Sequence, residues 1–321
     1  MRRSLSDQRT VADLIDGARF RLSVGAHPER AHEDADRLLL HIVQEHDPKR
    51  NNAWLMTNRA SLLLPRTEAR FDAFVDRRAT GEPIQYITGE QEFYGLPFRV
   101  TPDVLIPRPE TEHVVEKTLE LAATLDSTVT GHDFSRAESR TEQDRAIAPA
   151  EFPRILDVGT GSGAIAVALA HNLPNAQIIA VDVSPAALKV ASGNAERNGV
   201  KDRIRFRQSD LLATVADQRF QMVVSNPPYV PTADRDSLSI EVREHEPALA
   251  LFAGEDGLDV FRRLIPAAFA VLEPSGFLLM EIGFGQSAAV AALLADAGFG
   301  GIDFLPDLQG IPRVACAQRP A

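Results

Sequence analysis

The sequence predicts an α/β fold: a doubly wound, mostly parallel seven-stranded sheet with an antiparallel edge strand, preceded by a small helical domain and a β-hairpin connection. From Arg154 onward, short apolar runs alternate with helical patterns, as expected for parallel strands joined by crossover helices. A glycine-rich turn follows the first of these runs, and the N-terminal 80 residues carry helical stripes without a strand pattern.

Residues 1–80 are expected to form the helical domain. Apolar residues recur there at helical spacing, and Thr10 and Asp13 are placed as an N-terminal capping pair. The stripes are Val11, Leu14, Ile15, Ala18 and Leu22, then Ala31, Ala35, Leu38 and Ile42, then Phe71, Phe74 and Val75. Because such faces must be buried against one another, they predict one small bundle.

Residues 81–111 are expected to connect the two domains as a β-hairpin. Ile84–Thr88 and Phe98–Ile106 are β-prone runs broken by glycine and proline. A helix is predicted from Glu112 to about Leu125. Residues 126–152 are rich in polar residues and are predicted to be a mobile surface insertion within the second domain, residues 112–321.

The second domain shows the strand and helix alternation in order. Strands are predicted at Ile155–Val158, Gln177–Asp182, Ile204–Gln208, Met222–Ser225, Phe277–Ile282, Ile302–Leu305 and Arg313–Ala317, and helices from Gly163, from Pro185, near Leu258–Leu272 and at Gln286–Ala297. The last two strands are close enough in sequence to pair as an antiparallel edge.

Composition excludes several classes of function. A lone cysteine, Cys316, rules out an internal disulfide and a CxxC-type metal site, and the eight histidines lack metal-ligand spacing, so no metal is expected. The net charge of −11 disfavours stable binding to nucleic acid. No signal peptide or membrane-spanning run is recognised, which predicts a soluble, cytoplasmic protein without a membrane partner.

The first sheet strand ends in a ligand-binding loop, Asp157-Val158-Gly159-Thr160-Gly161-Ser162-Gly163. Glycines let the backbone turn tightly and approach a ligand at the N-terminus of a helix. Gly159, Gly161 and Ala164 also satisfy the loose dinucleotide pattern, so the loop alone does not distinguish the two kinds of nucleotide cofactor.

Two further segments follow neighbouring strands. Asp182 ends the second strand, where a carboxylate can accept hydrogen bonds from both hydroxyls of an adenosine ribose, although it could instead cap the next helix. Ser209-Asp210-Leu211 follows the third strand and is placed to meet an adenine, or is an ordinary turn.

The most specific motif, Asn226-Pro227-Pro228-Tyr229, follows the fourth strand. Two prolines fix the backbone, so the Pro227 carbonyl is a rigid acceptor beside the Asn226 side-chain oxygen, and two acceptors can hold one NH2 group. The Tyr229 ring offers a surface for a planar amide or base.

This tetrapeptide and the Asp157–Gly163 loop resemble methyltransferases that act on planar NH2 nitrogens. Further segments resemble the glutamine methyltransferases of peptide chain release factors: Gly81–Gly89, Glu92–Gly95, Ile106–Glu112, Asn194–Gly199, Glu246-Pro247, Ala253-Gly254, Asp256-Gly257 and Arg313-Val314. The resemblance spans nearly the whole chain. It departs in the long polar segment 126–152 and at Leu211, where relatives often carry an aromatic residue.

The resemblance implies S-adenosylmethionine as cofactor and class 1 release factors as protein substrate, methylated on the glutamine N5 of a Gly-Gly-Gln motif. It implies cofactor contacts from Gly159, Thr160, Gly161, Ser162, Gly163, Asp182, Leu211 and Asn226. It implies that Asn226, Pro227, Pro228 and Tyr229 bind the substrate amide, with Asn226, Pro227 and Tyr229 as the catalytic residues. Residues 1–80 would then recognise the substrate.

Three alternatives remain at this point. A nucleic-acid amine methyltransferase could use the same two acceptors, although the net charge of −11 counts against it. A nicotinamide-dependent oxidoreductase would leave the Asn-Pro-Pro-Tyr segment without a role. A noncatalytic adaptor is weakened because none of the expected site positions is disrupted.

Overall fold

The chain forms two units, each with its own core. The structure is a computed structural model and describes residues 8–130 and 153–321. One unit comprises Met1–Glu90 with Asp236–His245, and the other comprises Gln91–Arg235 with Glu246–Ala321.

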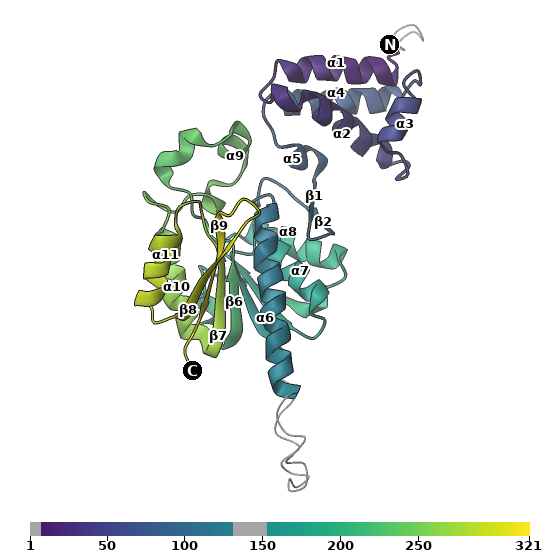
Figure 1. The fold of residues 1–321 in the computed structure, drawn as a ribbon. Helices are drawn as coiled ribbons and strands as arrows, with labels where there is room; N and C mark the ends of the chain where they lie inside the picture. Colours follow the sequence, from purple (N-terminus) through teal and green to yellow (C-terminus); the bar gives the residue numbers. More distant parts are fainter. Residues whose placement is uncertain (1–7, 131–152) are drawn as a thin grey trace. The chain divides into compact units, whose positions relative to one another are not determined.

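The first unit is the helical bundle that the apolar stripes predict. Its helices are α1 (Val11–Ser23), α2 (Ala31–Gln44), α3 (Asn52–Thr57), α4 (Pro65–Ala79), α5 (Ile84–Thr88) and α9 (Ile240–His245) (Figure 1). Every predicted stripe residue is buried. Thr10 and Asp13 form a reciprocal capping box at the start of α1, as predicted.

A buried arginine ties segment 236–245 to the bundle. Arg78 of α4 is 1% exposed, and its Nε donates to Asp34 Oδ2 of α2 at 2.5 Å. Its Nη1 donates to Glu241 Oε1 of α9 at 2.5 Å. A buried guanidinium needs such partners because its charge is costly to remove from water.

The connection differs from the expected pair of extended runs. Ile84–Thr88 is the short helix α5, because Pro83 begins it and Gly89, with φ +77°, ends it in a left-handed conformation. The run therefore buries Ile84 and Ile87 from a helix. A short apolar run cannot be assigned to helix or strand by periodicity alone, which explains the wrong prediction.

A hairpin is present a few residues later. Strands β1 (Glu90–Phe93) and β2 (Leu96–Arg99) pair as a two-stranded sheet. The turn residues Tyr94 and Gly95 both have positive φ, 53° and 71°, as a tight two-residue hairpin turn requires. The predicted strand Phe98–Ile106 is largely wrong: only Phe98 and Arg99 lie in β2, because the chain leaves the sheet after Arg99.

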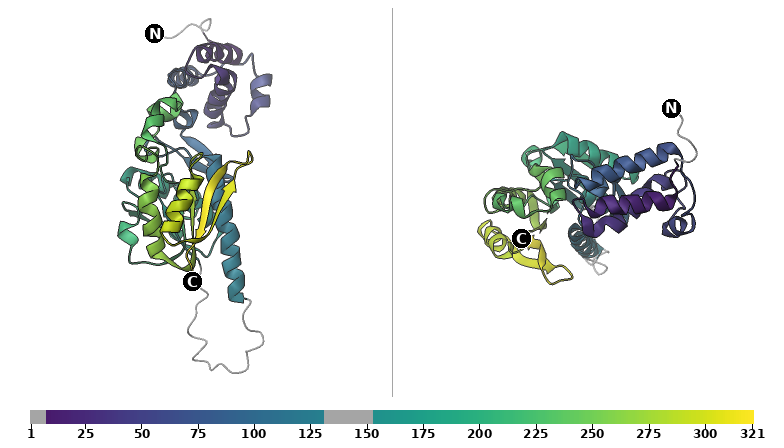
Figure 2. Two further views of the ribbon diagram at one scale, coloured as in Figure 1. Left: turned by 60° about the vertical axis from the view of Figure 1, so that its left-hand side comes forward. Right: turned by 90° about the horizontal axis from the view of Figure 1, so that it is seen from above.

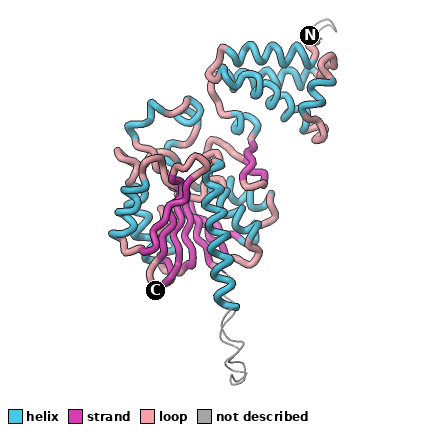
Figure 3. Tube along the Cα trace, in the orientation of Figure 1, coloured by secondary structure: helices cyan, strands magenta, loops and turns pink. Residues whose placement is uncertain are grey.

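The second unit is a seven-stranded sheet in the order β5-β4-β3-β6-β7-β9-β8 (Figure 3). The strands are β3 (Arg154–Val158), β4 (Gln177–Asp182), β5 (Ile204–Gln208), β6 (Phe220–Ser225), β7 (Leu272–Glu281), β8 (Gly300–Pro306) and β9 (Pro312–Gln318). The first five are parallel. β9 pairs antiparallel with both β7 and β8, which confirms the antiparallel edge.

Helices cover both faces of this sheet, as the alternation predicts. They are α6 (Glu112–Thr130), α7 (Ala164–Asn172), α8 (Pro185–Arg197), α10 (Asp259–Val271) and α11 (Ser287–Asp296), and short 3₁₀ helices occur at Pro28–Arg30, Pro109–Thr111, Lys201–Arg203, Ala213–Val215, Thr232–Ser237 and Ala248–Ala250. Residues of α6, α7 and α8 share one apolar cluster with the sheet, and α10 and α11 share the other. Figure 2 shows α6 running along the sheet, where it contacts β7 and β9.

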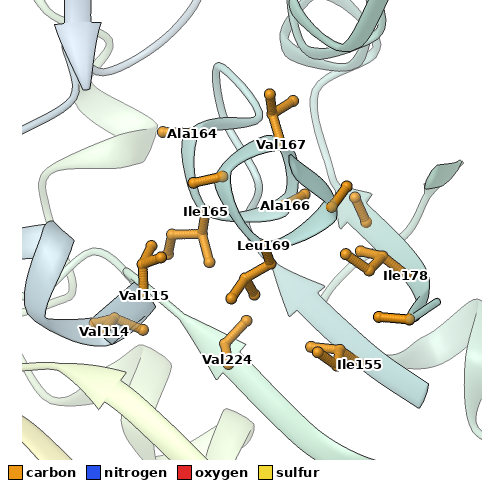
Figure 4. Close-up of a cluster of buried hydrophobic side chains, with 14 of the residues drawn as sticks. Val114, Val115, Ile155, Ala164, Ile165, Ala166, Val167, Leu169, Ile178 and Val224 are labelled. Carbon is orange, nitrogen blue, oxygen red and sulfur yellow. The ribbon is translucent and has the colours of Figure 1, made fainter. Parts of the chain in front are cut away.

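Alternation along β3 explains how one strand serves both cores. Ile155 belongs to the cluster under α7, whereas Leu156 belongs to the cluster under α10. Successive strand side chains point to opposite faces, so an apolar strand buried on both sides has no polar alternation. Figure 4 shows the first cluster, with Val224 of β6 beside residues of α7.

The order in which strands are added to the sheet reverses between β3 and β6. After β3 the chain builds β4 and β5 on one side, then returns to place β6 against the other side of β3, with Val158 opposite Ser225. Such a switch point opens a crevice at the carboxyl ends of the strands. The Asp157–Gly163 loop and the Asn-Pro-Pro-Tyr segment both begin at this crevice.

Helix α6 is five residues longer than predicted, so residues 126–130 of the expected insertion are helical. Residues 131–152, which hold the rest of that expected mobile segment, lie outside the described residues. Within residues 8–130 and 153–321, no helix has both the length and the apolar character needed to cross a membrane.

Candidate active site

A cavity of about 260 Å³ lies in the second unit at the carboxyl ends of β3, β4 and β6. Of the residues expected at the site, Gly159, Thr160, Gly161, Ser162, Asp182, Leu211, Asn226 and Pro228 line it. Gly163, Pro227 and Tyr229 do not appear in its lining. The lining also includes residues that sequence reasoning did not select, namely Asp103, Val104, Leu105, Pro107, Thr111, Val183, Leu249, Phe252 and Arg263 among others.

The glycine loop has the backbone conformation that selects glycine. Gly159, Gly161 and Gly163 have φ values of 72°, 54° and 83°, in the left-handed region. A Cβ on Gly163 would lie 3.1 Å from the Ala191 Cβ of α8, so this glycine also permits close packing of α7 on α8. Nothing lies within 4 Å of a Cβ placed on Gly159, so conformation rather than space selects glycine there.

Asp157 lies fully buried beneath this loop. Its Oδ2 accepts hydrogen bonds from Thr160 Oγ1 at 2.6 Å and from the Ala166 backbone N–H at 3.2 Å. Across the described parts of the chain, no group donates a hydrogen bond to its Oδ1. Burial raises the pKa of Asp157 to about 7, against the lowering effect of its two hydrogen bonds.

Asp182 orders the rim of the cavity from the end of β4. Its Oδ2 accepts from the Gly161 backbone N–H and its Oδ1 accepts from the Ser184 backbone N–H, both at 2.9 Å. Ser184, not Asp182, caps α8 by accepting from the Ala187 N–H. Each carboxylate oxygen can accept more than one hydrogen bond, so Asp182 keeps capacity for a ligand.

Apolar side chains form another part of the wall. Leu211, whose φ of 48° is unusual for a branched residue, lines the cavity with Val183 and Leu249. Val183 is 44% exposed and Leu249 is 65% exposed, so this wall presents apolar surface to a ligand. Asp210 forms an ion pair with Arg263 at 2.7 Å at the same wall.

The Asn-Pro-Pro-Tyr segment is held by a chain of hydrogen bonds. Asn226 Nδ2 donates to Thr111 Oγ1 at 2.9 Å, and Thr111 Oγ1 donates to Glu281 Oε2 at 2.5 Å. Tyr229 donates its hydroxyl to Glu281 Oε1 at 3.0 Å. One N–H of the Asn226 amide is therefore committed to Thr111, and its oxygen Oδ1 remains available as an acceptor.

Two glycines lie in close contact with Tyr229, one with its backbone and one with its ring. A Cβ on Gly257 would meet the Tyr229 carbonyl oxygen at 2.3 Å, and a Cβ on Gly283 would lie 3.0 Å from its Cδ2. Gln286 Nε2 donates to the same carbonyl at 3.0 Å. A side chain at Gly257 would displace the Tyr229 backbone, whereas one at Gly283 would press on the Gln286 side chain and on the edge of the Tyr229 ring.

Thr111 and Glu281 are the functional candidates that sequence reasoning did not identify. Thr111 belongs to the Ile106–Glu112 segment, which resembles the release factor glutamine methyltransferases, but the resemblance gives its hydroxyl no role. Glu281 had one signal: it is a carboxylate directly after the apolar run 277–280 of strand β7, at the edge where ligands bind. Arg108, at the start of the same segment, forms an ion pair with the buried Glu246 at 2.5 Å.

Two family models and full-length relatives identify the chain as an S-adenosylmethionine-dependent methyltransferase. The family model described as Methyltransferase small domain matches residues 145–242, and the one described as PrmC N-terminal domain matches residues 13–89. The hMettl16 catalytic domain, solved in complex with MAT2A 3'UTR hairpin 6, covers 82% of this chain and 85% of its own with a TM-score of 0.50. At 16% identity it shows the fold alone.

Relatives over almost the full length define the family. The release factor glutamine methyltransferase of Koribacter versatilis is 41% identical over 92% of this chain and 95% of its own. That of Cereibacter sphaeroides is 41% identical over 97% of this chain and 99% of its own. This chain belongs to the release factor glutamine methyltransferase family.

Proposed function

We propose that this enzyme transfers the methyl group of S-adenosylmethionine to the side-chain amide nitrogen N5 of the glutamine in the Gly-Gly-Gln motif of class 1 peptide chain release factors. The observation that carries the proposal is the orientation of Asn226. One N–H of its Nδ2 is bound to Thr111 at 2.9 Å, and its Oδ1 remains an acceptor on a residue that lines the cavity. An acceptor is what an incoming NH2 group requires.

The cavity fits the cofactor in charge and in shape. Asp157 lies fully buried beneath the loop and outside the cavity lining, and its Oδ1 has no hydrogen-bond donor among the described residues, so when ionised it places negative charge behind the wall that a cationic cofactor would face. Asp182 retains acceptor capacity for ribose hydroxyls, and Leu211 with Leu249 offers apolar cover for an adenine ring. When bound, S-adenosylmethionine supplies a methyl group on a positively charged sulfur, which makes that methyl electrophilic.

The role of the chain's own residues follows from the weakness of an amide as a nucleophile. Asn226 Oδ1 and the Pro227 carbonyl would accept the two N–H groups, which orients the nitrogen toward the methyl group. The same acceptors stabilise positive charge as it develops on that nitrogen. The proton leaves after methylation, when the nitrogen is strongly acidic, so these residues need not include a strong base.

Tyr229 would support the amide through its ring. Its hydroxyl is tied to Glu281, and burial raises its pKa well above the usual range, so it remains a neutral phenol. A ring fixed in this way can cover one face of a planar amide without changing its own position.

Residues 1–80 are proposed to recognise the release factor. Residues 13–89 match the PrmC N-terminal domain, and a domain with a family model of its own is suited to a task such as recognising the family's substrate. Contacts remote from the reacting amide supply binding energy that orients it, which free glutamine cannot provide. A cytoplasmic location belongs to the same proposal. So does the absence of stable nucleic-acid binding, which rests on the net charge of −11.

Mass spectrometry of the substrate tests the proposal. Intact release factor is incubated with the enzyme and S-adenosylmethionine, digested, and searched for a gain of one methyl group. We expect the gain on the glutamine of the Gly-Gly-Gln peptide, and we expect it to be lost with Asn226→Ala. A methyl group on another residue, or none with active cofactor-binding enzyme, contradicts the substrate assignment.

A further inference from the structure

Glu281 and Thr111 are joined to the Asn-Pro-Pro-Tyr segment from distant parts of the second unit. Glu281 ends strand β7 and is 2% exposed, and Thr111 ends the short 3₁₀ helix before α6 and is 3% exposed. Glu281 accepts from Thr111 through Oε2 and from Tyr229 through Oε1. Both oxygens of the carboxylate are thus occupied, and Asn226 is reached only through Thr111.

The direction of each hydrogen bond in this chain is set by the carboxylate. An ionised Glu281 can only accept, so the Thr111 hydroxyl must give its single proton to Oε2. Thr111 Oγ1 can then only accept from Asn226, which turns Nδ2 inward and leaves Oδ1 toward the cavity. Burial raises the pKa of Glu281 overall, and the hydrogen bonds from the Thr111 and Tyr229 hydroxyls oppose that shift.

Resting on the function proposed above, we propose that Glu281 and Thr111 are positioning residues that set which atom of the Asn226 amide faces the substrate. Neither residue would touch the reacting amide. They act by fixing the polarity of one hydrogen-bond chain, so that the cavity presents an oxygen to the substrate NH2 group. A reversed chain would present the Asn226 NH2 group to the substrate NH2 group, and two donors cannot pair.

Glu281→Gln should reverse the direction of these hydrogen bonds without moving the residues that form them. Tyr229 donates to the atom at Oε1, so the glutamine oxygen stays there and its Nε2 faces Thr111. Nε2 then donates to Thr111 Oγ1, Thr111 donates to Asn226, and the asparagine amide turns over. We expect kcat for methyl transfer to fall about a hundredfold, the loss typical of one transition-state partner, while the KM for the cofactor stays within about twofold.

The sharpest test is the double variant Glu281→Gln with Asn226→Asp. An aspartate at position 226 accepts at both ends, so it can take the reversed Thr111 proton and still offer an oxygen to the substrate. Asn226→Asp alone should be weak, because its carboxylate and Glu281 then compete for the one Thr111 proton. We expect the double variant to exceed either single variant in kcat by about tenfold or more.

Thr111 supplies a matched pair of controls. Thr111→Val removes the relay and should lower kcat, whereas Thr111→Ser keeps a hydroxyl and should restore most of it. Thr118→Val is the comparison variant, because Thr118 is fully buried but its hydroxyl only donates to the Val114 carbonyl of its own helix. It should leave kcat unchanged.

The polarity can also be measured without substrate, by NMR of the side-chain NH2 group of Asn226. Its resonance is assigned by its disappearance in Asn226→Asp. The NH2 protons should exchange slowly with water in the wild type and faster in Glu281→Gln. Equal exchange rates, or a double variant no more active than the more active single variant, would overturn the polarity proposal. A wild-type enzyme that leaves release factor unmethylated would instead overturn the proposed function, while the exchange rates still decide the polarity.

Discussion

Two buried carboxylates lie at the ligand-binding edge of the same sheet, and they are used in opposite ways. Asp157 lies near the end of β3 and Glu281 ends β7, and burial raises the pKa of both. Asp157 has one oxygen without a donor among the described residues, whereas both oxygens of Glu281 accept hydroxyl protons. An incompletely paired buried charge is suited to a cationic ligand, and a fully paired one is suited to holding other groups in place.

The difference divides the site into two halves with different chemistry. The half around Asp157 and Asp182 would bind a charged cofactor, so its residues keep acceptor capacity. The half around Asn226 would bind a neutral amide, so its groups are fixed by internal hydrogen bonds before any ligand arrives. Substitutions in the first half should change cofactor binding, and those in the second should change turnover.

The largest effect is expected in the amide half, from Asn226→Ala. Removing one acceptor for the developing charge typically costs about 3 kcal/mol, or about a hundredfold in kcat. Circular dichroism should show an unchanged fold. Near-normal turnover at saturating cofactor would remove Asn226 from the mechanism.

A smaller effect is expected in the cofactor half, from Asp182→Ala. The carboxylate would bind ribose hydroxyls equally in the ground and transition states, so the cofactor KM should rise about tenfold while kcat changes little. Asp182→Asn is the milder control, since it keeps one oxygen acceptor. A collapse of kcat with an unchanged KM would show that Asp182 had been placed in the wrong half.

Tyr229→Phe should have a smaller effect, again in the amide half. The ring is retained, but Glu281 loses one of its two donors, which typically costs about 1 kcal/mol or several-fold in kcat. Methyl-transfer rates at saturating substrates provide the measurement. A loss as large as that of Asn226→Ala would mean that the hydroxyl itself takes part in the reaction.

The smallest effect on turnover is expected from Asp157→Asn, whose signature is in stability. The pKa of Asp157 is about 7 in the folded protein and near 4 in the unfolded chain. The contribution of Asp157 to the free energy of unfolding is therefore fully present below about pH 4 and is lost as the pH rises through about 7. The melting temperature of the variant relative to the wild type should therefore increase between about pH 4 and pH 7. A difference that is constant with pH would show that Asp157 is ionised throughout this range.

Much of the fold could be predicted because its signals are local. Strand β3 is apolar on both faces and is followed at once by the glycine loop, so its position and its parallel environment are both encoded within a few residues. Ile84–Thr88 was predicted wrongly for the opposite reason. Five apolar-rich residues suit either a strand or a turn of helix, and their burial within the helical unit decided between them.

The site was predictable only where a motif carries it. Asp182 ends strand β4 and Asn226 directly follows strand β6, and sheet topology places such residues at one edge. The roles of Thr111 and Glu281 depend on a hydrogen bond across 170 positions of sequence, which no local pattern encodes. Asp157 could be identified from the sequence as the first residue of the loop motif. That Oδ2 accepts from Ala166 of α7 while Oδ1 has no donor among the described residues is known only from the structure.

One measurement tests the central claim that the site holds an NH2 group between two acceptors on a release factor glutamine. Labelled methyl transfer is compared for intact release factor, its Gly-Gly-Gln variant carrying Gln→Glu, and oligonucleotides with unpaired adenine or guanine. We predict label in the intact release factor alone, because a carboxylate offers no hydrogen to Asn226 or Pro227 and faces them with negative charge. Label in the oligonucleotides and none in the release factor would contradict the account.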